Sequence, residues 1–96
     1  MTTYDLQFLP SALKEWQALD ASIQRQFKTK LRRRLQQPQV PGSRLKAMPD
    51  CYKIKLASAG YRLIYRVNES AITVLVVAVG KRENLKVYRN ASERLT

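Results

Sequence analysis

Four basic residues recur at alternate positions of a predicted β-hairpin: Lys53 and Lys55 on its first strand, and Arg62 and Arg66 on its second. At a period of two, all four point to one face of the sheet, while tyrosine and aliphatic residues point to the other. If residues 57–60 form the turn, Lys55 lies directly opposite Arg62, although a bulge at Gly60 would shift this register. Like charges that face each other destabilise a sheet. An anion such as a nucleic-acid backbone would therefore balance this face.

A cationic face of this kind could cleave RNA. Attack of a 2′-hydroxyl on the neighbouring phosphate needs an acceptor for the proton of the nucleophile, positive charge beside the phosphate and a donor for the leaving 5′-oxygen. Basic residues and a phenol for these tasks are available at Lys53, Lys55, Arg62, Arg82 and Tyr88. Crowding of cations lowers the pKa of a lysine, which allows one lysine to act as the base without a metal. The spacing alone favours simple phosphate binding over catalysis.

Composition also indicates a polyanionic partner. The 96 residues include 18 Lys and Arg against 7 Asp and Glu, which gives a formal charge of +11. Solubility alone needs a net charge of about 2 to 8 in a small domain, whereas a strong basic excess is typical of phosphate-binding proteins. The length predicts one domain over residues 1–96 with a modest core.

Several functions are excluded by residue types that are missing. The chain has no histidine and one cysteine, so it can form neither a standard zinc site nor a histidine-dependent nucleophile. We expect no metal and no cofactor, and we expect Cys51 to be a buried packing residue. A single cysteine fits a reducing cytoplasm. The longest apolar run, residues 71–79, is too short to span a bilayer, which predicts no membrane contact.

Apolar spacing predicts the order of elements. A short strand over residues 4–9 is followed by a helix that starts at Pro10, buries Ala12, Leu13 and Trp16 and stops near residue 19. Asp20 is the expected N-cap of a second helix, which buries a residue every fourth position up to the Gln37-Pro38 pair. After the hairpin, residues 71–79 predict a central strand that ends at Gly80. A short terminal helix would use the apolar positions Leu85, Val87, Tyr88, Ala91 and Leu95.

The second helix has a strongly basic outer face. Six cations and no acid occur between residues 22 and 35, namely Arg25, Lys28, Lys30, Arg32, Arg33 and Arg34. A charged face of this kind is usually only solvated, but this number exceeds what solvation requires. The face therefore favours contact with a polyanion.

The order of short motifs resembles the RelE family, the ribosome-dependent mRNA interferases of bacterial toxin–antitoxin pairs. The motifs are ALKEW at 12–16, MPDCYKIKL at 48–56, GYRL at 60–63, VGKRE at 79–83 and VY at 87–88, and together they cover essentially the whole chain. The resemblance implies an α+β RelE/ParE-like fold, in which an N-terminal helical hairpin packs on a small, mainly antiparallel sheet with a short C-terminal helix. It also implies cleavage of mRNA in the ribosomal A site of the 30S subunit within the 70S ribosome, and neutralisation by a RelB-like antitoxin.

Transferred position by position, the resemblance implies that Lys53 and Lys55 are base and charge stabilisers. Arg62 would hold the scissile phosphate, Arg82 would act as leaving-group acid or its electrostatic substitute, and Tyr88 would orient or deprotonate the nucleophile. RNA or ribosome contacts are expected at Lys28, Lys30, Arg32, Arg33, Arg34, Lys46 and Lys81. Lys46 stands where the family often has arginine, so a phosphate contact would survive there without bidentate geometry. Ala57 and Asn84 stand where relatives carry arginine, so the contacts made by those arginines are not expected here.

Two other functions remain open. ParE-type toxins share this fold but inhibit DNA gyrase, so the fold alone does not decide the activity. A basic RNA-binding module is the third possibility, although the chain lacks the aromatic stacking platform of single-strand binders. The combination of paired lysines, Arg62, Arg82 and Tyr88 favours the nuclease.

Overall fold

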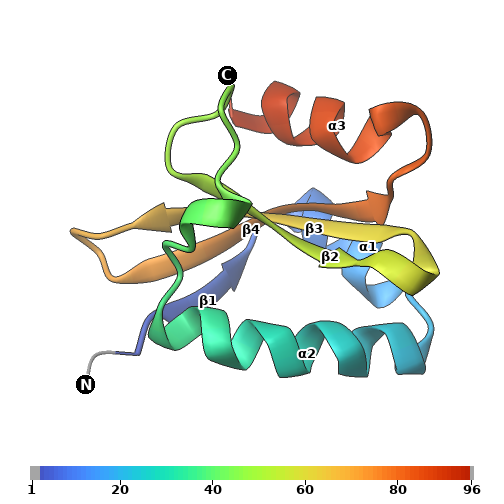
Figure 1. Cartoon of the computed structure of the whole chain (residues 1–96), viewed down its shortest axis with the longest axis horizontal. Coiled ribbons are helices and arrows are strands. Elements are labelled where there is room, and N and C mark those ends of the chain that lie inside the picture. Colours follow the sequence, from blue (N-terminus) through green and yellow to red (C-terminus); the bar gives the residue numbers. More distant parts are fainter. Residues whose placement is uncertain (1–2, 96) are drawn as a thin grey trace.

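The computed structural model describes residues 3–95 of the chain. The main elements follow in the order β1 (Asp5–Phe8), α1 (Pro10–Gln17), α2 (Ala21–Gln36), β2 (Cys51–Leu56), β3 (Tyr61–Asn68), β4 (Thr73–Lys81) and α3 (Lys86–Leu95) (Figure 1). One sheet has the strand order β1-β4-β3-β2, in which β1 pairs parallel to β4 and the other neighbours are antiparallel. The predicted α+β fold class, with a mainly antiparallel sheet, is confirmed.

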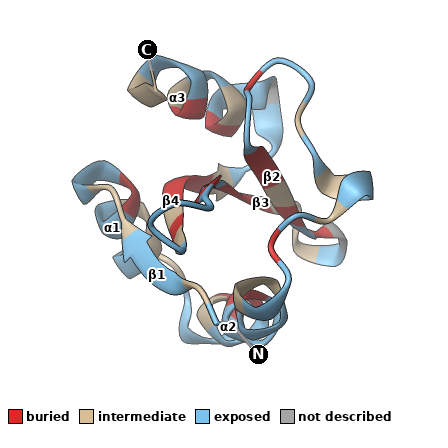
Figure 2. Ribbon diagram, turned by 90° about the vertical axis from the view of Figure 1, so that its left-hand side faces the viewer, coloured by how far each residue is buried: buried red, intermediate tan, exposed pale blue. Residues whose placement is uncertain are grey.

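Helices α2 and α3 cover opposite faces of the sheet. Phe27 and Leu31 of α2 pack on one face with Ile54 of β2, and Val87 and Ala91 of α3 pack on the other. Figure 2 shows α2 and α3 on either side of the strands, with their buried residues turned towards the sheet. The face that bears the hairpin cations therefore also has an apolar part beneath α3, which the sequence pattern did not predict.

A bulge in β4 explains why consecutive valines can serve both cores. Ile64 pairs with Ala78 and Tyr65 pairs with Val76, which leaves Val77 as the additional residue. Because the alternation shifts at this point, Val76 and Val79 join the α2 core, while Val77 and Ala78 join the α3 core. The predicted central strand is confirmed, but it begins at Thr73 and continues past Gly80 to Lys81.

The predicted helices are present, with three corrections to their side chains. The first helix starts at Pro10, and the second is preceded by Asp20, whose side chain makes no capping hydrogen bond. Leu13 was expected in the core but is 39% exposed, because the buried stripe of α1 is narrow and centred on Ala12. Leu85 was expected in the terminal helix but precedes it and is 56% exposed. None of the helices within residues 3–95 is long and apolar enough to cross a membrane.

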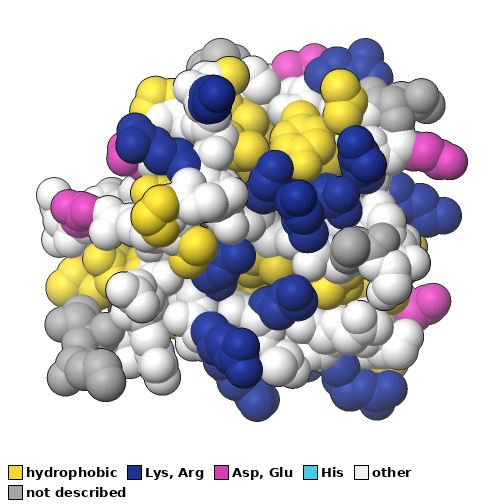
Figure 3. Space-filling model, in the orientation of Figure 1, with side chains coloured by type: hydrophobic (Ala, Val, Ile, Leu, Met, Phe, Trp, Pro, Cys, Tyr) yellow, Lys and Arg dark blue, Asp and Glu magenta, His cyan; other side chains and the backbone are white. Residues whose placement is uncertain are grey.

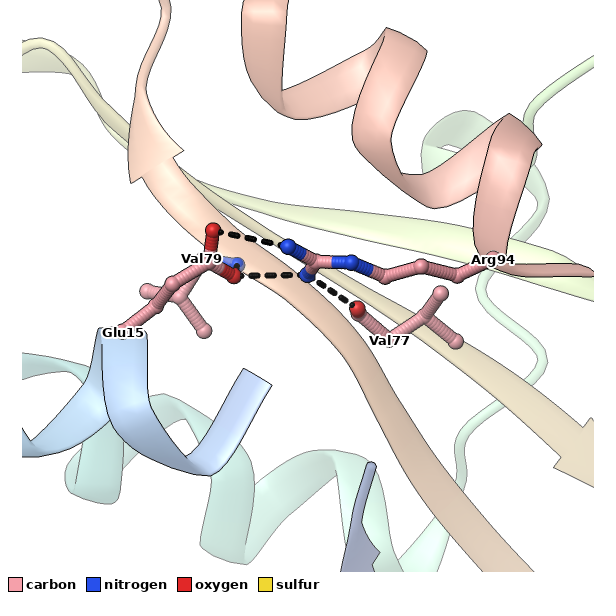
Figure 4. Close-up of polar contacts among 4 residues, drawn as sticks. All are labelled: Glu15, Val77, Val79 and Arg94. Atoms are coloured by element: carbon pink, nitrogen blue, oxygen red, sulfur yellow. Dashed lines mark hydrogen bonds and ion pairs between the residues drawn. The ribbon is translucent and has the colours of Figure 1, made fainter. Parts of the chain in front are cut away.

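Past the end of β1, the backbone edge of β4 forms hydrogen bonds with side chains instead of with another strand. The amide of Val79 donates to Glu15 Oε1 at 3.1 Å, and Arg94 Nη1 donates to the carbonyl oxygen of Val77 at 2.9 Å. Arg94 also forms a bidentate pair with Glu15, at 2.7 and 3.1 Å (Figure 4). An open strand edge is a site of unwanted pairing. This charged cluster closes the edge and ties α1, β4 and α3 together.

Candidate active site

A hollow of about 260 Å³ gathers residues from four separate segments. It is lined by Lys53, Lys55, Arg62, Arg82, Leu85 and Tyr88. All five residues that the sequence predicted to be catalytic are therefore brought to one place. Four of them are cations, and no acidic residue is among the described residues of its lining.

The hairpin supplies three of these cations through its register. Lys55 pairs with Arg62 and Leu56 pairs with Tyr61, so the predicted register holds without a shift at Gly60. Arg62 is only 7% exposed, and its Nη1 donates to the carbonyl oxygen of Tyr61 at 2.9 Å. Arg62 is thus the most buried of the four cations that line the hollow, and its guanidinium has one donor used. A partly desolvated cation interacts more strongly with a phosphate than a fully solvated one does.

The connection from β4 to α3 supplies Arg82. Its amide donates to the carbonyl oxygen of Gly60 at 2.8 Å, which fixes this residue to the turn between β2 and β3. Gly60 has φ +68°, a left-handed conformation that glycine adopts without strain. The exposed side chain of Arg82 lines the hollow from this connection.

Tyr88 comes from the first turns of α3 and is half-buried. Its neighbour Val87 is buried in the α3 core, which orients this turn of the helix on the sheet. At the other end of α3, Arg94 holds the helix to Glu15 and β4. Tyr88 is therefore presented by a helix that is fixed at both ends.

Arg34 corrects the predicted outer face of α2. Its Nη1 donates to the carbonyl oxygen of Lys53 at 3.1 Å and to Tyr65 Oη at 2.9 Å, and its Nη2 donates to Ser43 Oγ at 3.1 Å. Tyr65 in turn donates to the carbonyl oxygen of Pro38 at 2.6 Å. Burial raises the pKa of Tyr65, against the opposing effect of the Arg34 hydrogen bond. Arg34 therefore braces the strand that bears Lys53 instead of facing a polyanion.

The other predicted RNA-binding residues lie outside the hollow. On α2 the exposed ones are Lys28, Lys30, Arg32 and Arg33, while Lys46 is exposed in the loop before β2 and Lys81 at the end of β4. The α2 residues belong to the opposite face of the sheet from α3. Figure 3 nevertheless shows Lys and Arg side chains spread from the region of α3, over the β2 side of the molecule, down to α2. Acidic side chains lie towards the margins of this view.

Leu85 is the lining residue that sequence reasoning missed. Its place in an apolar pattern indicated a core position, and no local signal marks the left-handed backbone that turns it outwards. Among residues 3–95, no group of three or more His, Cys, Asp or Glu side chains is arranged to hold a metal ion. The chemistry available in the hollow is that of lysine, arginine and tyrosine.

Comparison with known proteins decides the family. A family model for the ParE toxin of the type II toxin–antitoxin system parDE matches residues 6–85. The chain is also 47% identical to the mRNA interferase toxin RelE of Escherichia coli strain K12 over 92 residues, which is 96% of this chain and 97% of that protein. This chain belongs to the RelE/ParE family of type II toxins.

Solved structures agree with this assignment. A mutant of the E. coli toxin RelE in the free state superposes with a TM-score of 0.91 and 45% identity, over 98% of this chain and 99% of the other. A RelE mutant in complex with a peptide of the antitoxin RelB gives a TM-score of 0.81 and 46% identity, over 95% of both chains. The resemblance read from the motifs is confirmed, and the RelE-like fold extends over nearly the whole toxin.

Proposed function

We propose that this toxin is an endoribonuclease that cleaves mRNA in the ribosomal A site and so inhibits translation. The observation that supports this most is the convergence of Lys53, Lys55, Arg62, Arg82 and Tyr88 on one small hollow. The extensive identity to a protein named as an mRNA interferase supports the same reaction.

In the proposed reaction, the 2′-oxygen attacks the adjacent phosphorus while the bond from phosphorus to the 5′-oxygen breaks. The products are a 2′,3′-cyclic phosphate and a 5′-hydroxyl. Lys53 or Lys55, in its neutral form, takes the proton of the 2′-hydroxyl, and the other lysine remains charged beside the phosphate. Tyr88 Oη orients the nucleophile or relays its proton.

The two arginines stabilise charge in this scheme. Arg62, the most buried cation of the hollow, holds the non-bridging oxygens of the scissile phosphate. Arg82 remains protonated throughout because a guanidinium does not give up its proton in a protein. It therefore acts on the leaving 5′-oxygen as an electrostatic substitute for an acid, and the proton comes from solvent or from the protonated lysine.

The surrounding basic surface would dock on the ribosome. Contacts with ribosomal RNA are assigned to Lys28, Lys30, Arg32, Arg33, Lys46 and Lys81, all of which are exposed. Binding through phosphate contacts falls steeply with salt. Arg34, which was predicted among these residues, is assigned a supporting role instead because its donors are directed inwards.

The proposed inhibitor is a RelB-like antitoxin, as in the complex of the E. coli relative. A formal charge of +11 on 96 residues favours fast capture of an acidic or amphipathic segment. The association rate with the co-encoded antitoxin should therefore fall as salt is raised. An association rate that does not change with salt would argue against electrostatic steering.

The test of the proposed function is a comparison of substrates. Purified toxin is incubated with naked message and with the same message on a programmed ribosome, and primer extension maps the cuts. We expect cuts within the A-site codon on the ribosome and little cleavage of naked message. Equal cleavage of both would contradict ribosome dependence.

A second candidate is gyrase inhibition, which the family model's ParE name brings into consideration. The same preparation is assayed for supercoiling by DNA gyrase. Inhibition of gyrase without any message cleavage would replace the nuclease by this candidate.

A further inference from the structure

Leu85 is placed in an unusual way for a large apolar residue. It is 56% exposed, the most exposed of the large hydrophobic residues that the structure describes. Its backbone has φ 56°, in the left-handed region that residues with a side chain rarely adopt.

Leu85 stands between two hollows. One is the 260 Å³ hollow of the candidate active site. The other, of about 620 Å³, is lined by Ala59, Gly60, Lys81, Arg82, Glu83 and Leu85. Only Arg82 and Leu85 line both, and the amide of Leu85 donates to the carbonyl oxygen of Arg82 at 2.9 Å. The backbone therefore holds the leucine side chain beside Arg82, at the boundary between the two spaces.

An enzyme that cleaves a phosphodiester must accommodate a nucleotide on each side of the scissile phosphate. The smaller hollow has the cations and the phenol for the phosphate and the attacking ribose. The larger hollow lies on the Arg82 side and has neither Lys53, Lys55 nor Tyr88 in its lining. Since Arg82 is assigned to the leaving oxygen, the nucleotide 3′ of the scissile phosphate extends towards the larger hollow.

We propose that Leu85 packs against the base of this leaving nucleotide and so helps to determine which messages are cut. A nucleobase has an apolar face. It could therefore cover the exposed aliphatic side chain of Leu85 at the boundary between the two hollows. The inference rests on the proposed function, because it uses the assignment of Arg82 to the leaving oxygen.

The test removes each partner of the contact in turn. Leu85→Asn replaces the apolar side chain by one that tolerates the left-handed backbone. To remove the other partner, programmed ribosomes present a message with an abasic nucleotide either 3′ or 5′ of the scissile phosphate. Single-turnover cleavage rates are measured for each combination. Leu85→Met keeps an apolar side chain of similar length and should retain the wild-type rate.

Ile72 offers a matched control. It is also a large aliphatic residue, 40% exposed and with φ 53°, but it lies in the turn between β3 and β4. In Figure 1 this turn is at the opposite end of the sheet from the connection between β4 and α3. Ile72→Asn should leave the cleavage rate unchanged, and thermal unfolding of both Asn variants checks that they remain folded.

We expect Leu85→Asn to slow cleavage of the intact message about tenfold, at the lower end of the range for one lost apolar contact. The defect should disappear when the 3′ base is absent and persist when the 5′ base is absent. An equal defect with and without the 3′ base would overturn the contact, and a defect that depends on the 5′ base would overturn its placement. If wild-type toxin cleaves no programmed message, the proposed function and this inference both fail. If the wild type cleaves the message and Leu85→Asn cleaves it at the same rate, the contact of Leu85 is refuted and the proposed function stands.

Discussion

Two charged clusters lie on either side of the end of β4, and they differ in how their cations are partnered. At the strand edge, Arg94 donates to both oxygens of Glu15 and to the carbonyl oxygen of Val77. In the hollow, the side chains of Lys53, Lys55 and Arg82 make no hydrogen bond or ion pair with any other described residue. The first cluster uses its donors to hold the fold together, whereas the second leaves its donors unused by the described fold, as the proposed reaction requires.

Arg34 belongs to neither cluster, and it shows the same difference between neighbouring arginines of one helix. It stands next to the exposed Arg32 and Arg33 on α2, yet its donors reach Lys53, Ser43 and Tyr65. Residue type therefore does not separate a structural arginine from a functional one. The difference lies in which acceptors the fold places around the guanidinium.

The largest effect is expected from the lysines of the hollow. Lys53→Arg and Lys55→Arg keep a positive charge but cannot readily lose a proton, so the substitution of the general base should lower cleavage by about 100-fold or more. The substitution of the other lysine should have a much milder effect. Single-turnover rates on programmed ribosomes check this, with Lys14→Arg, at an exposed position of α1, as control. If both substitutions lower the cleavage rate only slightly, neither lysine is the base.

The strand-edge cluster should respond in stability. Arg94→Gln or Glu15→Gln should lower the free energy of unfolding by about 2 kcal/mol, because charge-assisted hydrogen bonds are lost at a partly buried site. The double variant should cost less than the sum of the single ones. Urea unfolding measures all three, with Lys14→Gln as the exposed control on α1. If the loss of the double variant equals the sum of the two single losses, Arg94 and Glu15 do not stabilise the fold as a pair.

Neighbouring arginines of α2 should differ in the same assay. Arg34→Lys should lower the free energy of unfolding by about 1 kcal/mol, because a lysine cannot reach Lys53, Ser43 and Tyr65 at once. Arg32→Lys, two positions away and exposed, should change it by less than about 0.5 kcal/mol. If the two variants unfold alike, the inward contacts of Arg34 do not stabilise the fold.

The stability should also depend on pH through Cys51, which is fully buried. Burial raises the pKa of its thiol from 9.0 to about 11. The unfolded chain releases this proton as pH rises above 9, while the native chain keeps it until about pH 11, so the thiol's contribution to stability falls across this window. Urea unfolding at pH 8 and pH 10 should therefore show a larger loss for wild type than for Cys51→Ala. Equal losses would contradict the linkage.

Much of the fold could be predicted from the sequence because its signals are periodic. Spacing of four residues from Ile23 to Leu35 marked α2, and alternation in the hairpin set the pairing of Lys55 with Arg62. The bulge at Val77 could not be predicted. The residues on both sides of it are apolar, so no alternation of polar and apolar residues marks the change of face. Arg34 could not be predicted either, because its acceptors come from remote segments of the chain.

For the candidate site, spacing alone indicated phosphate binding and left catalysis open. The resemblance to the RelE family implied the five residues that the fold then places around one hollow. Leu85 was missed because a leucine in an apolar pattern is indistinguishable from a core residue until its backbone conformation is known.

In the proposed reaction Arg82, unpartnered among the described residues, acts on the leaving oxygen and contributes little to ribosome binding. The most direct test measures the single-turnover cleavage rate of Arg82→Ala on programmed ribosomes, together with its affinity for them. We predict a rate at least about 100-fold below wild type, since one charge-stabilising donor is worth on the order of 3 kcal/mol in the transition state. Affinity should remain within about threefold, because many other phosphate contacts persist. A cleavage rate within about threefold of wild type would contradict this role of Arg82.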